Sequence, residues 1–397
     1  MRSLQAVLLG LLLAMSTLSG CLFLEESDEA QEELFPVIKY SPSSNIRAGD
    51  VVYFDASSST PSDGSLTYRW DFDSDNSIDE TGRTAEWTFQ VTGTFEVTLT
   101  ISDGSRSKDT SKSITIGEAG AEPPSATITQ YSDSEDCEDE AISENTHIVL
   151  WICERDKEMS DRSIDATMTV SLDGSDSDSG DPSQYIASWH WDLDLNEDSD
   201  ADGDSENDAD LSGESVNWEN VAPGEYEIAL TVKNDVGFVD KDTIRVYISY
   251  AGYWSDFEIS GNTSNNAIEE DFDVMIVYDK DGGNTIRKAV AELTYPQQDG
   301  DCTPVVGTNN CRAKLDLYAY NEDDEEAANT SEVGIDQRSD GDDCDESNND
   351  CIYLTLSSYL FTDSDSTYGD GEWTITIQND KFNDLLVESF VIRLYYK

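Results

Sequence analysis

The sequence has few basic side chains and two histidines. It contains 23 Lys and Arg against 85 Asp and Glu, which gives a formal net charge of -62 at pH 7. A surface of this sign repels nucleic acid phosphates and argues against a role in binding DNA or RNA. The same charge attracts cations and keeps a protein soluble in salty water.

The motifs of common hydrolytic sites are missing as well. The chain has neither Gly-x-Ser-x-Gly nor His-Glu-x-x-His. His147 begins an apolar run, and His190 lies on the solvent side of its predicted strand, so neither is placed as the base of a catalytic triad. No pair of carboxylates stands out as a glycosidase pair. The sequence therefore predicts a protein that is not an enzyme.

Long apolar runs are absent except at the N-terminus. The run from Leu4 to Leu18, roughly 15 residues, is short for a membrane span, which needs about 20. It predicts a secretory signal over residues 1–20. Leu18-Ser19-Gly20-Cys21 resembles the lipobox of bacterial-type lipoproteins. The resemblance implies cleavage before Cys21 and lipidation of this residue; ordinary cleavage after Ser16 is the alternative.

Seven cysteines fit an exported chain. Beside the expected lipid site at Cys21, six remain, and an oxidising compartment favours disulfides between them. They form three close pairs, namely Cys137 with Cys153, Cys302 with Cys311, and Cys344 with Cys351. Six cysteines allow 15 connectivities, so pairing between nearest neighbours is an expectation and not a deduction. Zinc is the rival, but no Cys-x-x-Cys occurs.

Short alternating apolar runs dominate the chain after an acidic, flexible tether expected over residues 21–34. This is the pattern of an all-β protein. Two segments repeat each other: Tyr68-Arg69-Trp70-Asp71-Phe72-Asp73 is matched by Trp189-His190-Trp191-Asp192-Leu193-Asp194. The interval from Trp70 to Gly93 is 23 positions and that from Trp191 to Gly224 is 33, so the second copy has about ten more residues in one loop.

These residues resemble the polycystic kidney disease (PKD) repeat, an immunoglobulin-like β-sandwich found in surface proteins and secreted hydrolases. The family pattern joins an Asp-Ala-Ser strand end, a Trp-Asp-Phe strand and a Gly-Thr-Tyr-x-Val-x-Leu-x-Val strand. The first copy follows it with Asp55-Ala56-Ser57 but departs at Ser74-Asp75-Asn76, and the second has Gly174 for the Ala. The resemblance implies PKD-like domains over residues 35–118 and 124–250.

From residue 251 the pattern changes. The sequence Gly371-Glu372-Trp373-Thr374-Ile375-Thr376-Ile377-Gln378-Asn379, followed by Phe390-Val391-Ile392-Arg393-Leu394, looks like the end of the P domain of proprotein convertases. That family supports a neighbouring protease or binds. The expected fold is therefore all-β: tandem immunoglobulin-like sandwiches, then a jelly-roll-like sandwich over residues 251–397.

The acidic loops after the two tryptophan strands are the candidate metal sites. Carboxylates at alternate positions suit Ca²⁺, which takes six to eight hard oxygens, and so much charge repels itself unless a cation binds. Neither loop is an EF-hand, so a closing ligand would come from elsewhere, such as Asp208 or Asp210; a solvated acidic loop is the alternative. The candidate ligands are Asp71, Asp73, Asp75 and Asp79, and in the second loop Asp194, Asn196, Asp198, Asp200, Asp202 and Asp204.

Together these features predict a non-catalytic protein, anchored by lipid to the extracellular face of the cell membrane. Two PKD-like modules would form a calcium-stiffened stalk, and the C-terminal sandwich would bind a surface protein or a polysaccharide. The alternative is an accessory subunit or docking module of a secreted protease or glycoside hydrolase. A solute-binding lipoprotein is disfavoured because its βαβ lobes need helices.

Overall fold

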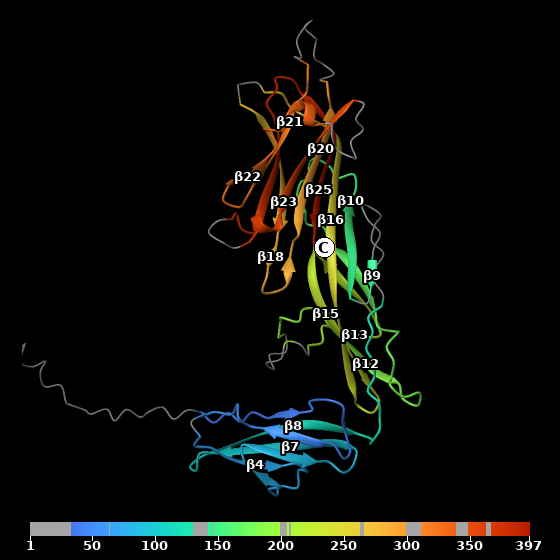
Figure 1. The fold of residues 1–397 in the computed structure, drawn as a ribbon, viewed down its shortest axis with the longest axis vertical. Coiled ribbons are helices and arrows are strands. Elements are labelled where there is room, and N and C mark those ends of the chain that lie inside the picture. Colours follow the sequence, from blue (N-terminus) through green and yellow to red (C-terminus); the bar gives the residue numbers. More distant parts are fainter. Residues whose placement is uncertain are drawn as a thin grey trace, which may run out of the picture. The chain divides into compact units, whose positions relative to one another are not determined.

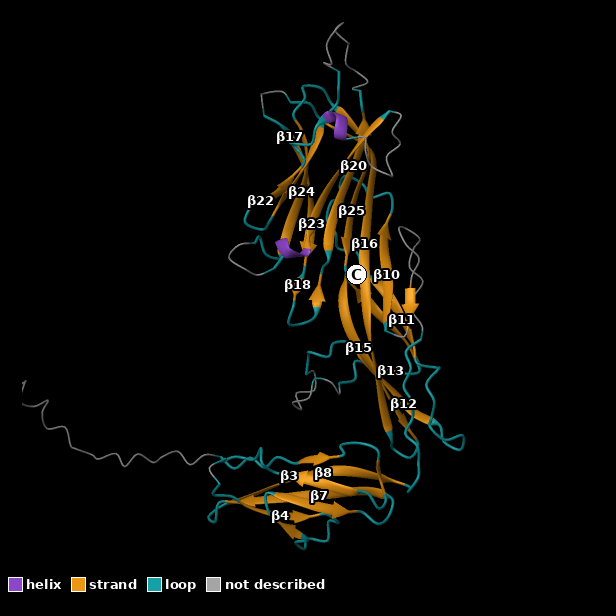
Figure 2. Cartoon of the chain, viewed as in Figure 1, coloured by secondary structure: helices purple, strands orange, loops and turns teal. Residues whose placement is uncertain are grey.

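The computed structural model describes residues 33–62, 64–129, 142–144, 146–198, 205, 208–262, 266–298, 311–338, 348–362 and 367–397. The expected signal segment and Cys21 lie outside them. The contacts divide the chain into two compact units, Met1–Ala119 and Gly120–Lys397. The expected all-β class is confirmed, because in the described part helical structure is limited to two short 3-10 turns (Figure 2). None of the helices there is long and apolar enough to cross a membrane.

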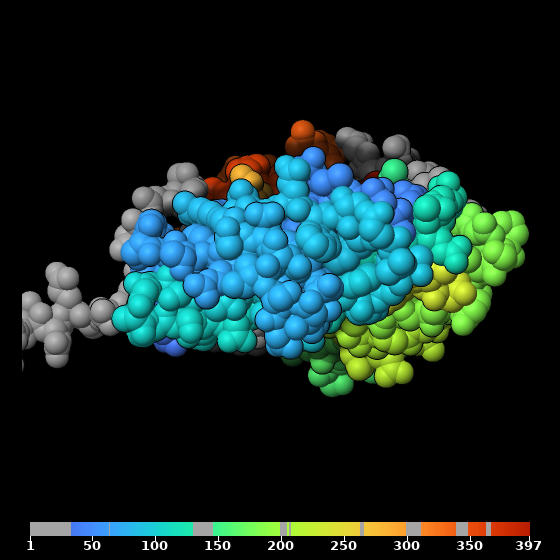
Figure 3. All heavy atoms as spheres, turned by 90° about the horizontal axis from the view of Figure 1, so that it is seen from below, coloured from blue at the N-terminus to red at the C-terminus, as the bar shows by residue number. Residues whose placement is uncertain are grey.

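Unit 1 is a β-sandwich of two sheets (Figure 1, blue to cyan). One sheet has the order β1 (Lys39–Ser41), β3 (Val51–Asp55) and β6 (Thr84–Thr88). The other has the order β2 (Ile46–Arg47), β8 (Ser107–Gly117), β7 (Gly93–Ser102), β4 (Thr67–Asp71) and β5 (Glu80–Thr81). The face of this unit that Figure 3 presents is closely packed with side chains.

The period-two pattern of these strands builds the core of unit 1. On β3, Val52 and Phe54 are buried while Val51 and Tyr53 are exposed. Phe54 packs on Phe72 with ring centroids 4.8 Å apart, and Trp70 is 0% exposed. The Trp70 indole N–H donates to the carbonyl of Gly82 at 2.9 Å, which satisfies the one polar atom of this buried ring.

Unit 2 is organised around one large sheet. Its order is β13 (Leu211–Ser212), β12 (Ile186–Asp192), β15 (Gly224–Asn234), β16 (Val239–Ile259), β25 (Leu385–Tyr395), β20 (Lys288–Pro296) and β23 (Asn349–Ser357), with β10 (His147–Glu154) and β9 (Ile142–Glu144) branching from β16. A second layer holds the pair β11 (Met168–Asp173) and β14 (Ser215–Val221), and the sheet β17 (Ile268–Ile276), β24 (Gly371–Asn379), β21 (Leu315–Tyr320) and β22 (Glu326–Asn329). The small hairpin β18 (Tyr278–Asp279) and β19 (Asn284–Thr285) lies beside them.

Strand β16 runs through the expected domain boundary between residues 250 and 251. It pairs first with β15 and then, from Tyr250 to Ile259, with β25 (Figure 1). Seven consecutive residues, 246–252, are buried, and a single apolar cluster joins Trp191 to Trp254 and Trp373. Residues 124–250 and 251–397 therefore share one sheet and one core, because the chain passes between them as a buried strand and not as a polar linker.

The N-terminal elaboration of the second copy forms the predicted strand. Residues 148–153 are buried along β10, which pairs antiparallel with β9 and parallel with β16. Cys153, Cys311 and Cys351 are each disulfide-bonded. The three other cysteines of the expected pairs, Cys137, Cys302 and Cys344, lie outside the described residues, so the connectivity stays a prediction.

Candidate functional site

The acidic loop of unit 1 gathers three carboxylates. One oxygen of each of Asp71, Asp73 and Asp79 lies within 4.8 Å of the others. Strand β4 ends at Asp71 and β5 begins at Glu80, so the two strand ends hold the loop at its base. The loop contains no Lys or Arg from residue 71 to residue 79. These are hard oxygen ligands of the kind that Ca²⁺ and Mg²⁺ take.

Backbone N–H groups wrap around Asp71. Its Oδ1 accepts from the N–H of Ser74 at 2.7 Å and its Oδ2 from that of Asn76 at 2.9 Å. Both donors have positive φ, 59° at Ser74 and 63° at Asn76, which tightens the turn. Asp79 accepts from the N–H of Phe72 at 2.7 Å. These bonds position the carboxylates of Asp71 and Asp79 in the loop.

Asp75 stands apart from this group. Its Oδ1 accepts both the side-chain O–H of Ser77 and, at 2.7 Å, the N–H of the same residue. The serine hydroxyl, and then the backbone N–H, hold the pKa of Asp75 below its ordinary value. The structure thus brings together three of the four carboxylates expected in the first loop. The fourth, Asp75, instead accepts hydrogen bonds from Ser77 within its own turn.

The second loop has the same base as the first. The N–H of Asp210 donates to the carbonyl of Trp191 at 2.9 Å, and the N–H of Leu193 donates to Asp210 at 2.7 Å. In unit 1 Asp79, Trp70 and Phe72 make the same bonds with the same lengths. The counterparts of Asp71, Asp73 and Asp79 are therefore Asp192, Asp194 and Asp210. The ten extra residues follow Asp194.

The expected ligands of the second loop are not gathered in the same way. Asp194 accepts from the N–H of Asn196 at 3.0 Å, and the Asn196 amide donates to the carbonyl of Gly282 at 3.3 Å. Asp198 is partly exposed. Asp200, Asp202 and Asp204 lie outside the described residues. Within the described ranges, the group in unit 1 is the one set of three metal-binding side chains that approach within 4.8 Å.

Asp192, which sequence reasoning did not single out, is the unusual carboxylate of the second loop. It is 3% exposed. Its Oδ1 accepts from the N–H of Asp194 at 3.3 Å, whereas its Oδ2 has no hydrogen-bond partner. Burial raises the pKa of Asp192 to about 6. The match of Trp70-Asp71 with Trp191-Asp192 was the signal that could have found it.

A pair of tyrosines lies on the outer face of the sheet formed by β17, β24, β21 and β22. The ring centroids of Tyr318 and Tyr320 are 6.3 Å apart and their planes differ by 10°. Across the strands, Tyr318 is flanked by Thr376 and Asn329. Burial raises the pKa of both phenols, so both stay protonated at neutral pH. We call this surface, with Asp271 and Gln378 at its edge, the tyrosine face.

A groove of about 590 Å³ lies on unit 1. Residues of β1, β3 and β6 line it together with Glu80 of β5, and Tyr53 in this lining is 54% exposed. Polar side chains surround this ring, among them Lys39, Asp55, Glu80 and Glu86. The groove thus places an exposed aromatic ring beside hydrogen-bonding side chains on the three-stranded sheet of unit 1.

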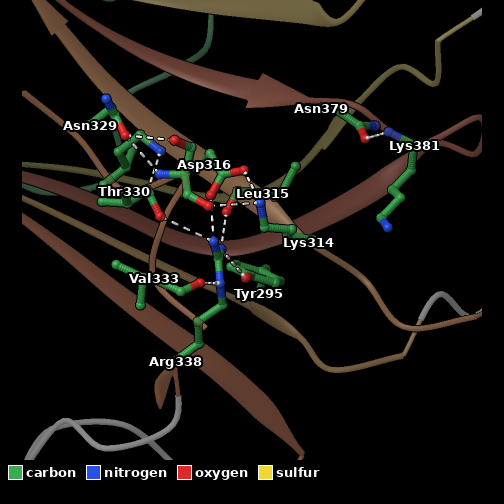
Figure 4. A network of polar contacts seen from close by, with 12 residues as sticks. Tyr295, Lys314, Leu315, Asp316, Asn329, Thr330, Val333, Arg338, Asn379 and Lys381 are labelled. Carbon is green, nitrogen blue, oxygen red and sulfur yellow. Dashed lines mark hydrogen bonds and ion pairs between the residues drawn. The ribbon is translucent and has the colours of Figure 1, made fainter. Parts of the chain in front are cut away.

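A buried ionic network holds the strands of the C-terminal half together (Figure 4). Arg338 is 0% exposed. It donates to the carboxylate of Asp316, to the Tyr295 hydroxyl at 2.9 Å and to the carbonyl of Leu315. The carbonyls of Val333, at 3.2 Å, and Thr330, at 3.3 Å, complete its shell. With its donors committed to the protein, Arg338 has a structural role.

Comparisons with known proteins identify one domain family. Residues 34–117 match the family model of the PKD domain, which agrees with the resemblance of the first copy. No curated protein matches the chain. The resemblance of the second copy to the PKD repeat and that of residues 251–397 to the P domain stay predictions.

The similar solved structures include fibronectin(III)-like and carbohydrate-binding modules. The fibronectin(III)-like modules of CbhA from Clostridium thermocellum have 13% identity and a TM-score of 0.23, over 54% of this chain and 95% of that one. Carbohydrate-binding modules of the β-sandwich superfamily have 13% identity and a TM-score of 0.20, over 92% and 97%. SGBP-B of Bacteroides ovatus, in complex with a mixed-linkage heptasaccharide, has 10% identity and a TM-score of 0.16, over 91% and 100%. Likeness at this level carries no information on what this chain binds.

Proposed function

We propose that the protein is a non-catalytic binding protein, lipid-anchored through Cys21 on the extracellular face of the membrane, with a polysaccharide as its ligand. The tyrosine face is the observation that carries this proposal. Two parallel rings offer an apolar surface to the C–H faces of sugars. The second carboxylate oxygen of Asp271 and the amide oxygen of Gln378 can accept hydrogen bonds from sugar hydroxyls, whereas the Asn329 amide is bonded to Glu326 and Ser331.

The charge of the chain favours a neutral or cationic polysaccharide over an anionic one. The strands beside the tyrosines bring Glu269, Asp271 and Asp273 to the same face, and these carboxylates repel sulfate or uronate groups. Acidic polysaccharides are therefore expected to bind weakly.

Glycan binding is tested with the full chain, first on an array and then by calorimetric titration. We expect the double variant Tyr318→Ala and Tyr320→Ala to bind at least about tenfold more weakly, because aromatic anchors dominate such contacts. Tyr185→Ala, at a tyrosine that is 65% exposed elsewhere on unit 2, serves as the control. Unchanged affinity in a double variant with an unchanged melting temperature would contradict the proposal. Co-purification with a hydrolase, without glycan binding, would favour the accessory-subunit alternative.

The lipid anchor is tested separately. Cells that produce the wild type or Cys21→Ser are separated into membrane and soluble fractions. The wild type should be found with the membranes and the variant in the soluble fraction or the medium, because a thiol is needed for acylation. Equal amounts of both in the soluble fraction would remove the anchor from the proposal.

Calcium is the expected cofactor of the stalk. The group Asp71, Asp73 and Asp79 supports this, since bringing three carboxylates together without a cation is unfavourable. Water and loop carbonyls would supply the remaining ligands. Millimolar Ca²⁺ should raise the melting temperature of unit 1, by mass action on the folded state. No shift and no heat on titration would remove calcium from the proposal.

A further inference from the structure

Two tripeptides of the chain have the form of an acceptor for N-linked glycans. They are Asn262-Thr263-Ser264 and Asn329-Thr330-Ser331, each with Ser two places after the Asn and no proline between. An N-linked glycan is bulky and polar, so the folded protein has to present the modified asparagine at its surface. The fold therefore decides which of the two asparagines can carry one.

Asn262 is in an unsuitable place. It is 8% exposed, and its backbone N–H donates to the carbonyl of Lys381 at 2.7 Å. The preceding Gly261 is packed so closely that an added Cβ would collide with the backbone of Phe382. A glycan on Asn262 would have to displace this packing, because the asparagine is covered by the chain around residue 382.

Asn329 is in a place that accommodates a glycan. It is the last residue of β22, an edge strand of its sheet, and it is exposed. Its Nδ2 donates to the exposed carboxylate of Glu326, and its Oδ1 accepts from the N–H of Ser331 at 3.0 Å and from the hydroxyl of the same residue at 2.7 Å. The amide nitrogen has two hydrogens, so a sugar in place of one leaves the other for Glu326. Modification of Asn329 therefore disturbs no part of the core.

The middle residue of this tripeptide fixes it to the sheet. Thr330 is 2% exposed. Its N–H donates to the carbonyl of Leu317 at 2.9 Å, and its hydroxyl accepts from the N–H of Leu317 at 2.8 Å (Figure 4). Side chains alternate along a strand, so the burial of Thr330 leaves Asn329 on the side that faces water. Because the tripeptide is held in this way, a glycan has to be attached before β22 docks on β21.

A sugar on Asn329 would begin beside the tyrosine face. Tyr318 and Asn329 are directly opposed on β21 and β22, and opposed side chains lie on one face of the sheet with Cβ atoms about 4.5–5.5 Å apart. The Tyr318 ring, stacked on that of Tyr320, offers an apolar surface to the C–H groups of the first sugar. Asp271 and Gln378, on β17 and β24, lie on the other side of the tyrosines. The glycan would therefore border the tyrosine face along β22 only.

We infer that Asn329 carries an N-linked oligosaccharide and that Asn262 does not. The inference rests on the export of the chain in the proposed function, and not on polysaccharide binding. The donor is an oligosaccharide carried on a polyprenyl pyrophosphate. Nδ2 of Asn329 attacks the anomeric carbon, the bond from this carbon to the pyrophosphate oxygen breaks, one amide proton is released, and the lipid pyrophosphate leaves.

The test is mass spectrometry of proteolytic peptides from the full chain, purified from the membranes of the cells that make it. Peptides with Asn329 should be heavier by the mass of an oligosaccharide, and fragment spectra should place the sugar on this asparagine. Ser331→Ala should lose the added mass although the acceptor amide is unchanged, whereas Ser331→Thr should keep it. Asn262→Gln is the matched control and should also keep it.

The N-terminal peptide of the same sample separates this inference from the proposed function. If the mature chain begins at a lipidated Cys21 and Asn329 is unmodified, the inference alone is refuted. If residues 1–20 are still present and Asn329 is unmodified, the export on which both rest is wrong. A glycan on Asn262, or one on Asn329 that persists in Ser331→Ala, would also contradict the inference.

Discussion

Replacing Arg338 with Met should destabilise unit 2 strongly and leave unit 1 unaffected. The guanidinium is fully buried and is shared among strands that are far apart in sequence. Without it, the Asp316 carboxylate, 2% exposed, keeps Lys314 at 2.8 Å as its cationic partner. The carbonyls of Thr330 and Val333 also lose the donor that Arg338 supplies. Met fills much of the vacated volume, so the main loss is electrostatic.

The magnitude follows from the loss of one of the two cations that face Asp316. Removing one partner of a buried ion pair costs about 3–5 kcal/mol, and we expect the lower end of this range because Lys314, at 2.8 Å, still compensates part of the charge of Asp316. With a urea dependence of the free energy of unfolding near the upper end for small proteins, about 3 kcal/mol per M, the midpoint of unit 2 should fall by about 1 M. The transition of unit 1 is the internal reference, since its core is separate.

The assay is urea unfolding followed by tryptophan fluorescence. Arg106→Met is the matched control: Arg106 pairs with Asp103 at 2.7 Å on the surface of unit 1, and an exposed pair contributes about 0–1 kcal/mol. Combining Arg338→Met with Asp316→Leu should recover part of the loss, because the buried carboxylate that Arg338 compensates is then absent and Lys314 is partly exposed to water. A loss below about 1 kcal/mol for Arg338→Met, or no recovery in the double variant, would refute the reasoning.

Three further predictions concern single positions. In chelator, the free energy of unfolding of Asp192→Asn should equal that of the wild type below pH 4 and exceed it above pH 6 by at most about 3 kcal/mol. The reason is that the raised pKa of about 6 favours folding with a neutral Asp192, and this stability is lost as the pH rises. Urea melts at both pH values measure the difference, and a difference that does not change with pH would contradict the prediction. Trp70→Ala should cost unit 1 about 3–5 kcal/mol in such melts, without moving the transition of unit 2. Ala251→Pro should lower the temperature of the single calorimetric transition of unit 2. Two separate transitions of unit 2 in this variant would contradict a shared core.

Much of unit 1 could be predicted from the sequence because its signals are local. Alternation around Phe54, Trp70 and Phe72 marks inward faces, and each of these side chains is buried. The spacing from Trp191 to Gly224 also located an insertion of about ten residues, which the matched hydrogen bonds of Asp79 and Asp210 confirm. Such features need only a short stretch of chain to be recognised.

Strand β16 was not predicted because its continuity depends on distant partners. The change of pattern after Tyr250 suggested a new domain, yet Tyr250 and Ala251 are both buried in the middle of the strand. Leu394, on β25, pairs with Tyr250, and Cys153, on β10, pairs with Ala251. A run without a clear turn between two sandwiches is compatible with either a linker or a strand that both share. The strands that pair with it determine which of the two forms.

The buried charges were missed for a related physical reason. In a chain with 85 acidic residues, sequence places nearly every carboxylate on the surface, and patterns then favour those that alternate in loops. Asp192 and Asp316 are among the few carboxylates that are buried, and their burial is decided by strands far along the chain. Burial separates a carboxylate from water, so its contribution to stability depends on whether the protein supplies a hydrogen-bond or ionic partner. In so acidic a protein, the carboxylates to test first are therefore the few that water cannot reach.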